Sequence, residues 1–132
     1  MSTLSTANIT SKAANTPPVI KDVNGTECGT FCRAWVKYDG TTNTINGSFN
    51  ISALTDVAAG VHTISFSTAM PNANYCVVTD CKSGQANRNQ FTNLGGSGEQ
   101  NLTTAGFSIV AMGSTNNYAY DSPITTAAVF GD

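Results

Sequence analysis

The four cysteines are the residues of this chain whose type and spacing could carry chemistry. Three residues separate Cys28 from Cys32, and four separate Cys76 from Cys81. Four thiolates at such spacings can hold zinc, but structural zinc sites commonly have a tighter knuckle with glycine, so we predict neither a metal nor a cofactor. Free thiols are favoured, with Cys32 and Cys76 as core residues; disulfides and a zinc site are the less favoured alternatives.

The single histidine and the carboxylates do not form a catalytic pattern. His62 shares one face of an alternating segment with Ile64 and Phe66, which favours a packing role over that of a general base. The eight acidic residues are dispersed and mostly stand in turns, where they cap backbone groups. A glycan hydrolase would need two carboxylates at one cleft. We therefore predict no catalytic residues and no enzyme.

Composition and charge exclude several classes of partner. The chain has 132 residues, of which 11% are charged, and its net charge is -2. One domain with its own core is expected, and no electrostatic footprint for nucleic acid or an anionic membrane is present. Residues 1–15 lack the basic start and apolar core of a signal peptide, and no run is long enough to span a membrane. We expect synthesis in a cytosol.

Period-two alternation predicts strands through most of the chain. Residues 31–38 place Cys32, Ala34, Val36 and Tyr38 on one face, as a half-buried strand requires. The other expected strands are 48–54, with Phe49, Ile51 and Ala53 together; 61–67, with His62, Ile64 and Phe66 inward; a more fully buried 75–79; a short 90–92; 107–112; and 127–130. Short strands without a helix predict an all-β protein with a single β-sandwich, either jelly-roll or immunoglobulin-like.

The N-terminal segment differs in composition from the rest. Residues 1–25 are polar, contain the Pro17-Pro18 pair and have only scattered apolar side chains. Such a segment cannot build a core, so we expect an extended arm that serves assembly, followed by a sandwich domain over residues 26–132.

The strand faces suggest a subunit interface. Trp35 lies on the face opposite the predicted core, flanked by Arg33 and Lys37, and Val61 points outward beside hydroxyl residues. An exposed tryptophan between cations is common at interfaces, so Arg33, Trp35, Lys37 and Val61 are the predicted contact residues. The alternative is that this strand is covered on both faces within one subunit.

Two polar, glycine-containing stretches are the predicted contact loops for an outside partner. Binding residues concentrate on loops that a rigid scaffold holds. The loops span residues 81–100 and 116–120, and the predicted contact residues are Gln85, Asn87, Arg88, Asn89, Asn116, Asn117, Tyr118 and Tyr120.

Three ordered segments carry a resemblance. RAWVKYDG at residues 33–40, SFNISALTD at 48–56 and GVHTISFSTAMPNANY at 60–75 resemble a pattern in tail-fibre-like structural proteins of marine bacteriophages and prophages, with a weaker echo in AAVF at 127–130. Lys37 and Tyr38 stand where that family tends to have Asn and Phe, and His62 stands at a Tyr position. Residues 82–122 match no part of the family pattern.

The resemblance implies a non-enzymatic virion protein on the exterior of a phage particle, made in the bacterial host cytoplasm. It implies a homotrimer of the tail-fibre or tail-tip type, whose loops meet a host-surface receptor or glycan. The arm would then contact other virion proteins. A capsid decoration protein on the phage head is the alternative, because the chain has no fibrous repeat or coiled-coil heptads.

Overall fold

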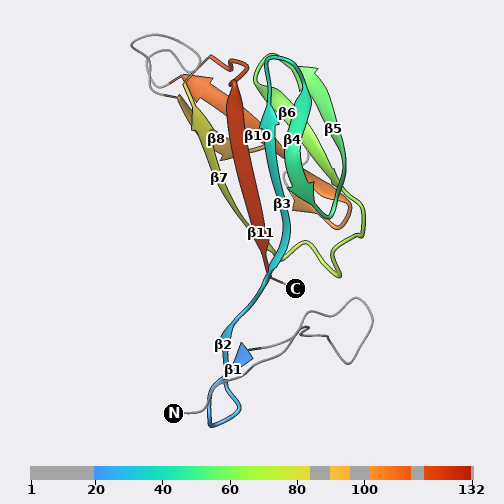
Figure 1. Ribbon diagram of the computed structural model, residues 1–132, viewed down its shortest axis with the longest axis vertical. Helices are drawn as coiled ribbons and strands as arrows, with labels where there is room; N and C mark the ends of the chain where they lie inside the picture. Colours follow the sequence, from blue (N-terminus) through green and yellow to red (C-terminus); the bar gives the residue numbers. More distant parts are fainter. Residues whose placement is uncertain (1–19, 84–89, 96–101, 114–117, 132) are drawn as a thin grey trace. The chain divides into compact units, whose positions relative to one another are not determined.

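The computed structural model describes residues 20–83, 90–95, 102–113 and 118–131 (Figure 1). The chain divides between Phe31 and Cys32 into an N-terminal unit and a larger unit. We describe each unit by itself.

The N-terminal unit contains a small hairpin. Strand β1 (Ile20–Lys21) pairs antiparallel with β2 (Glu27–Gly29). In the turn between them, the Asp22 carboxylate accepts hydrogen bonds from the backbone N–H groups of Asn24 and Thr26, at 2.9 and 2.8 Å. The predicted arm thus includes a locally ordered turn at its end, while its residues 1–19 lie outside the described part of the chain.

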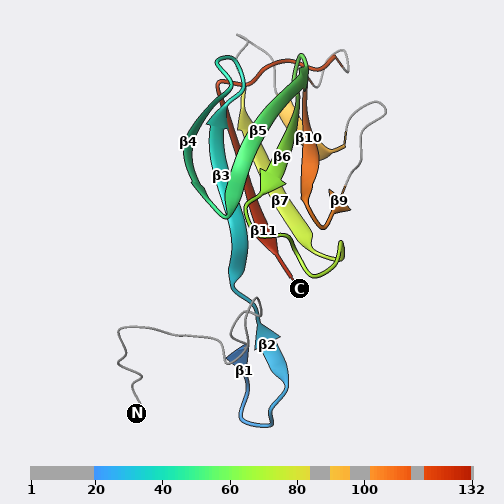
Figure 2. The ribbon, with the colours of Figure 1, turned by 90° about the vertical axis from the view of Figure 1, so that its right-hand side faces the viewer.

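The larger unit is a sandwich of two antiparallel sheets (Figures 1 and 2), which confirms the predicted all-β fold. The first sheet has the order β4-β3-β11-β7, with β3 (Cys32–Asp39), β4 (Thr44–Phe49), β7 (Cys76–Lys82) and β11 (Ile124–Phe130). The second has the order β5-β6-β10-β8, with β5 (Ile51–Ala58), β6 (Val61–Phe66), β8 (Gln90–Leu94) and β10 (Gly106–Gly113), and β9 (Leu102–Thr103) also pairs with β10.

The connectivity combines hairpins with crossovers between the sheets. The pairs β3–β4 and β5–β6 are hairpins within one sheet, and the chain crosses between sheets after β4, β6, β7 and β10. The first and last strands of this unit, β3 and β11, are central neighbours in one sheet, and β6 and β10 are central neighbours in the other. In the immunoglobulin order the first and last strands belong to different sheets, so the connectivity of this unit differs from that order.

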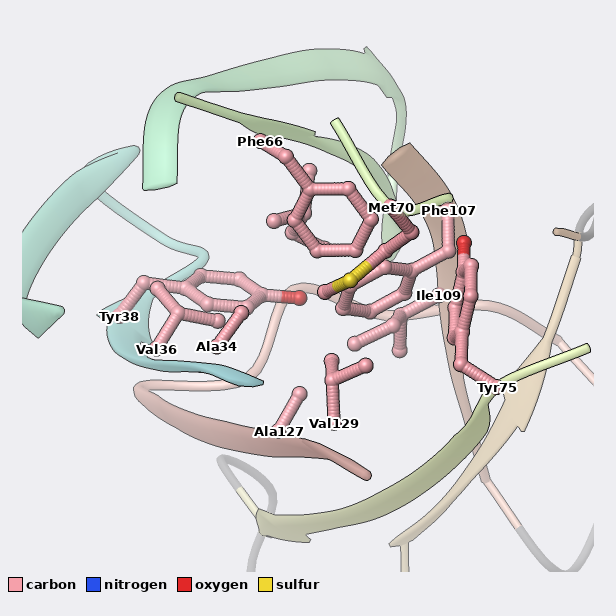
Figure 3. Packing of buried hydrophobic residues seen from close by; sticks show 11 residues of the cluster. Ala34, Val36, Tyr38, Phe66, Met70, Tyr75, Phe107, Ile109, Ala127 and Val129 are labelled. Atoms are coloured by element: carbon pink, nitrogen blue, oxygen red, sulfur yellow. The ribbon is translucent and has the colours of Figure 1, made fainter. Parts of the chain in front are cut away.

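The core lies between the sheets, where alternation places it. The inward residues of β3 (Ala34, Val36 and Tyr38) and of β6 (Ile64 and Phe66) are buried as predicted. They meet the inward residues of β10 and β11 and the two loop residues Met70 and Tyr75 (Figure 3). Burial raises the pKa of Tyr38 to about 12.

One aromatic cluster closes the core near the 67–75 connection. The Phe66 ring centroid lies 5.6 Å from that of Tyr75 and 5.7 Å from that of Phe107. The Tyr75 hydroxyl lies 2.8 Å from the carbonyl oxygens of Thr103 and Gly106 and donates to them. The buried ring thereby keeps its polar atom satisfied.

The expected strand over residues 48–54 is wrong, because the chain changes sheets within it. Asn50 separates β4 from β5 with a left-handed φ of 56°. Its Oδ1 accepts from the Thr68 backbone N–H at 2.7 Å, which fixes the corner. Asparagine tolerates this conformation better than other residues with a side chain. As a result Phe49 is exposed on the first sheet, whereas Ile51 packs against the core from the second.

The expectation of a more fully buried strand over residues 75–79 is met by Tyr75, which is 3% exposed and precedes β7, and is wrong for residues 76–79. Strand β7 is the last strand of its sheet, and its residues alternate between exposed and half-buried. Cys76 and Val78 point outward and are exposed, so Cys76 is not a core residue; Cys32 is half-buried. Strand β5 runs to Ala58, beyond the end of the expected 48–54 strand, and the turn follows at residues 59–60.

Candidate functional site

The outward face of the β4-β3-β11-β7 sheet carries large apolar side chains that are exposed. On β3 the inward neighbours Ala34 and Val36 are buried, whereas Trp35 between them is 43% exposed. The side chain therefore points away from the core, as alternation requires. Of the two alternatives for this strand, the structure of the single chain supports the exposed tryptophan.

Strand register extends this surface across the whole sheet. Trp35 is paired with Phe49 of β4 on one side and with Ala128 of β11 on the other, and Ala128 is paired with Val78 of β7. Phe49 is 55% exposed and Val78 59% exposed. We call these four residues, Phe49, Trp35, Ala128 and Val78, the apolar row. Sequence reasoning grouped Phe49 with Ile51 and Ala53 on one strand face and did not single out Val78.

Gly47, beside the apolar row, lets the Trp35 indole lie close to the surface of the sheet. A Cβ atom at Gly47 of β4 would stand 3.3 Å from both Cη2 and Cζ3 of Trp35. The six-membered part of the ring therefore covers Gly47. An indole in this position offers a broad apolar surface to a partner while its own backbone strand stays paired on both sides.

The other predicted interface residues divide between surface and interior. Lys37 is exposed on the same face as Trp35, and Arg33 is half-buried with its Nη1 atom donating to the Gly131 carbonyl at 3.4 Å. The prediction that Val61 is an exposed interface residue is wrong, because its side chain is only 9% exposed. It lies on the central strand β6, where Val110 of β10 and Ala58 of β5 flank it. Period-two alternation cannot reveal that an outward side chain is enclosed by its neighbours.

The second predicted contact loop and the part of the first that precedes β8 begin at one end of the sandwich. Gly113, before the second loop, pairs with Gln90, where β8 begins inside the predicted 81–100 loop, and the Gly113 N–H donates to the Tyr118 carbonyl at 3.0 Å. Tyr118 is 67% exposed and Tyr120 is half-buried. The remaining predicted contact residues lie outside the described part of the chain: Gln85, Asn87, Arg88, Asn89, Asn116 and Asn117.

His62 is buried near the same end, as predicted, and is 2% exposed. Its Nε2 atom lies 2.9 Å from Oδ1 of Asn43, whose Nδ2 donates to Oδ2 of Asp56 at 2.8 Å. Its ring centroid is 5.1 Å from that of Tyr38. Burial lowers the pKa of His62, and the nearby Asp56 and Asp121 carboxylates oppose this effect in part. The ring joins the 40–43 turn to β5 and β6.

The cysteines are thiols in the part of the chain that is described. Cys32, Cys76 and Cys81 are free, and the Cys32 Sγ donates to the Ala34 carbonyl at 3.1 Å. Burial, followed by the neighbouring Asp80 carboxylate, raises the pKa of Cys81. No group of three or more histidine, cysteine or acidic side chains within the described ranges is arranged to hold a metal ion.

No family model, no curated protein and no solved structure matches this chain. Within residues 20–83, 90–95, 102–113 and 118–131, no helix has the length and hydrophobicity to cross a membrane.

Proposed function

We propose that this chain is a non-enzymatic structural protein of a bacteriophage particle, which assembles with copies of itself through the face that carries the apolar row. The observation behind this proposal is the exposure of Trp35, Phe49 and Val78 on one continuous sheet face. Exposed apolar patches on small domains mark interaction sites, because a partner that covers them removes apolar surface from water.

The low charge of the chain supports association. Only 11% of the residues are charged and the net charge is -2, so little long-range repulsion opposes the approach of identical subunits. Trp35 is the type of side chain that dominates interface energies when a partner covers it. The apolar row is therefore the part of the surface where we expect copies to meet.

The location on a virion and the number three rest on the resemblance to tail-fibre-like phage proteins. In this proposal the exterior tail-fibre or tail-tip module is a homotrimer, its 81–100 and 116–120 loops contact a host-surface receptor or glycan, and its N-terminal segment contacts other virion proteins. The pairing of Gly113 with Gln90 supports the joint use of the second loop and the part of the first that precedes β8, because both begin at one end of the sandwich.

Capsid decoration is the second candidate. The observation in its favour is that the N-terminal segment forms a unit of its own, ending at Phe31, which a decoration protein can lay on its neighbours. Electron microscopy of the whole particle separates the two candidates, because a decoration protein would be seen on the head and a tail-fibre module on the tail.

Light scattering on the purified chain at micromolar concentration tests the proposal. We expect a trimer for the native protein and a large rise in the dissociation constant for Trp35→Ala, with an unchanged melting temperature in dilute solution. A matched control is Thr55→Ala, an exposed residue of β5 in the other sheet. A stable monomer would overturn the proposal, while a dimer would retain the interface and remove the number three.

A further inference from the structure

The row of residues next to the apolar row carries two opposite charges. Lys37 of β3 is paired with Thr126 of β11, and Thr126 is paired with Asp80 of β7. Lys37 and Asp80 alternate in phase with Trp35 and Val78 and are exposed on the same face. The sheet therefore presents a positive charge on its β3 side and a negative charge on its β7 side.

The two charges do not form an ion pair with each other within the described chain. They are two strands apart, which corresponds to about 10 Å in the sheet. No ion pair joins either side chain to another described residue, and the Asp80 Oδ1 atom accepts a hydrogen bond from the Cys81 backbone N–H at 2.8 Å. Both charges therefore remain open to a partner beside the apolar row.

The following row repeats the pattern with the signs exchanged. Asp39 stands at the end of β3, and Lys82 of β7 is paired with Ile124 of β11. Hydrogen bonds from Thr41 lower the pKa of Asp39 and keep it charged. The β3 side thus reads positive then negative along the strand, and the β7 side reads negative then positive.

Rotational symmetry turns this pattern into self-complementarity. Rotation about an axis parallel to the strands generates the next subunit, and each residue of that subunit keeps its position along the axis. The β3 side of one copy then meets the β7 side of the next at the same level, so that unlike charges face each other in both rows.

We infer that the partner of this face is a second copy of the chain, docked about an axis parallel to β11, with Lys37 of one subunit beside Asp80 of the partner subunit. This inference rests on the proposed function and adds the register of the contact. The apolar row supplies the buried centre, and the charged rows form its rim. A face that binds an unrelated acidic or basic partner would carry charges of one sign. This face carries both signs, and their order along the β7 side is the reverse of their order along the β3 side.

Charge reversal tests the register. Lys37→Glu and Asp80→Lys each place like charges in contact, so each should raise the dissociation constant of the assembly at least about tenfold. The double variant Lys37→Glu/Asp80→Lys should return to within about threefold of the native value, because it exchanges the signs and restores the pair. The neutral variants Lys37→Gln and Asp80→Asn should weaken assembly less than the reversals.

The hairpin offers a matched control. Lys21 and Glu27 are exposed register partners across β1 and β2 of the N-terminal unit, so the exchange Lys21→Glu/Glu27→Lys makes the same changes of charge in strands that are not part of the sandwich. We expect native assembly from this variant. Sedimentation velocity across a concentration series measures all of the variants, and thermal melting establishes that each is folded.

The outcomes separate the two proposals. If the native chain assembles and Trp35→Ala weakens it, but the charge reversals have no effect, the register is wrong and the proposed assembly face stands. If the reversals weaken assembly and the double variant stays weak, Lys37 and Asp80 do not face each other and the register is again wrong. A monomeric native chain overturns both.

Discussion

The Nε2 atom of His62 lies 2.9 Å from Oδ1 of Asn43, and this contact ties a central strand of one sheet to the turn that joins β3 and β4 of the other. Asn43 adopts a left-handed φ of 54°, and its amide also donates to Asp56. The buried and ionisable His62 ring therefore connects the two sheets at the end of the sandwich where the second predicted contact loop begins.

Stability should fall below neutral pH because of His62. Burial lowers its pKa in the folded chain, whereas the unfolded chain keeps a value of about 6.5. As the pH falls through about 6.5, the unfolded chain binds the proton first, so stability is full above this value and decreases until the folded pKa is reached. Urea unfolding between about pH 7.5 and 5 measures the effect, since carboxylates titrate mainly at lower pH.

His62→Gln is the matching variant for this prediction. It retains a side-chain donor toward Asn43 and removes the titration, so its stability should be lower at neutral pH and nearly constant down to about pH 5. Because the chain has a single histidine, no other imidazole can substitute in the measurement. An unchanged pH dependence in His62→Gln would contradict the assignment.

Gly47→Val should loosen the apolar row without unfolding the sandwich. The new Cβ would stand 3.3 Å from two atoms of the Trp35 ring, so the indole must move off β4. Valine is favourable in strands, and the backbone at this position needs no special conformation. The single tryptophan reports the change directly, so we expect red-shifted emission and weaker self-association. Thr44→Val, an exposed position of the same strand, should leave both unchanged.

The corner between β4 and β5 depends on Asn50. Asn50→Ala leaves in the left-handed region a residue that tolerates it less well than asparagine and removes the side-chain hydrogen bonds to Thr68 and Arg33, so we expect a loss of about 2 kcal/mol in the free energy of unfolding. Asn50→Gly keeps the backbone conformation and should lose about 1 kcal/mol. Chemical denaturation compares the two. Equal losses would show that the left-handed φ is not the cause.

Local pattern predicted the central strands correctly and failed where neighbours decide burial. Ala34, Val36 and Tyr38 on β3, like Ile64 and Phe66 on β6, are inward and buried because both strands have a partner on each side. Residues 48–54 alternate equally well, yet Asn50 turns the chain from one sheet to the other inside this run. A single local pattern cannot distinguish one strand from two that share its phase.

The candidate site was predictable only in part for the same reason. Trp35 is recognisable from its place between two cations on the face opposite the core. Phe49 and Val78 lie in the same row as Trp35 because of the strand register. Val78 comes from a segment more than 40 residues away along the chain. Pairings of this kind are set by the global fold and leave no local signal.

Deletion of residues 1–31 should leave a folded sandwich. The buried cluster begins at Ala34, and the chain divides between Phe31 and Cys32, so the truncation removes no core residue. We expect a cooperative thermal transition whose midpoint shifts by less than about 8 °C, equivalent to roughly 1 kcal/mol or less. Differential scanning calorimetry measures this shift. Deletion through Val36 is the contrasting variant, because it removes half of the central strand β3 and should abolish the transition. Loss of the transition in the shorter deletion would show that the N-terminal unit belongs to the core.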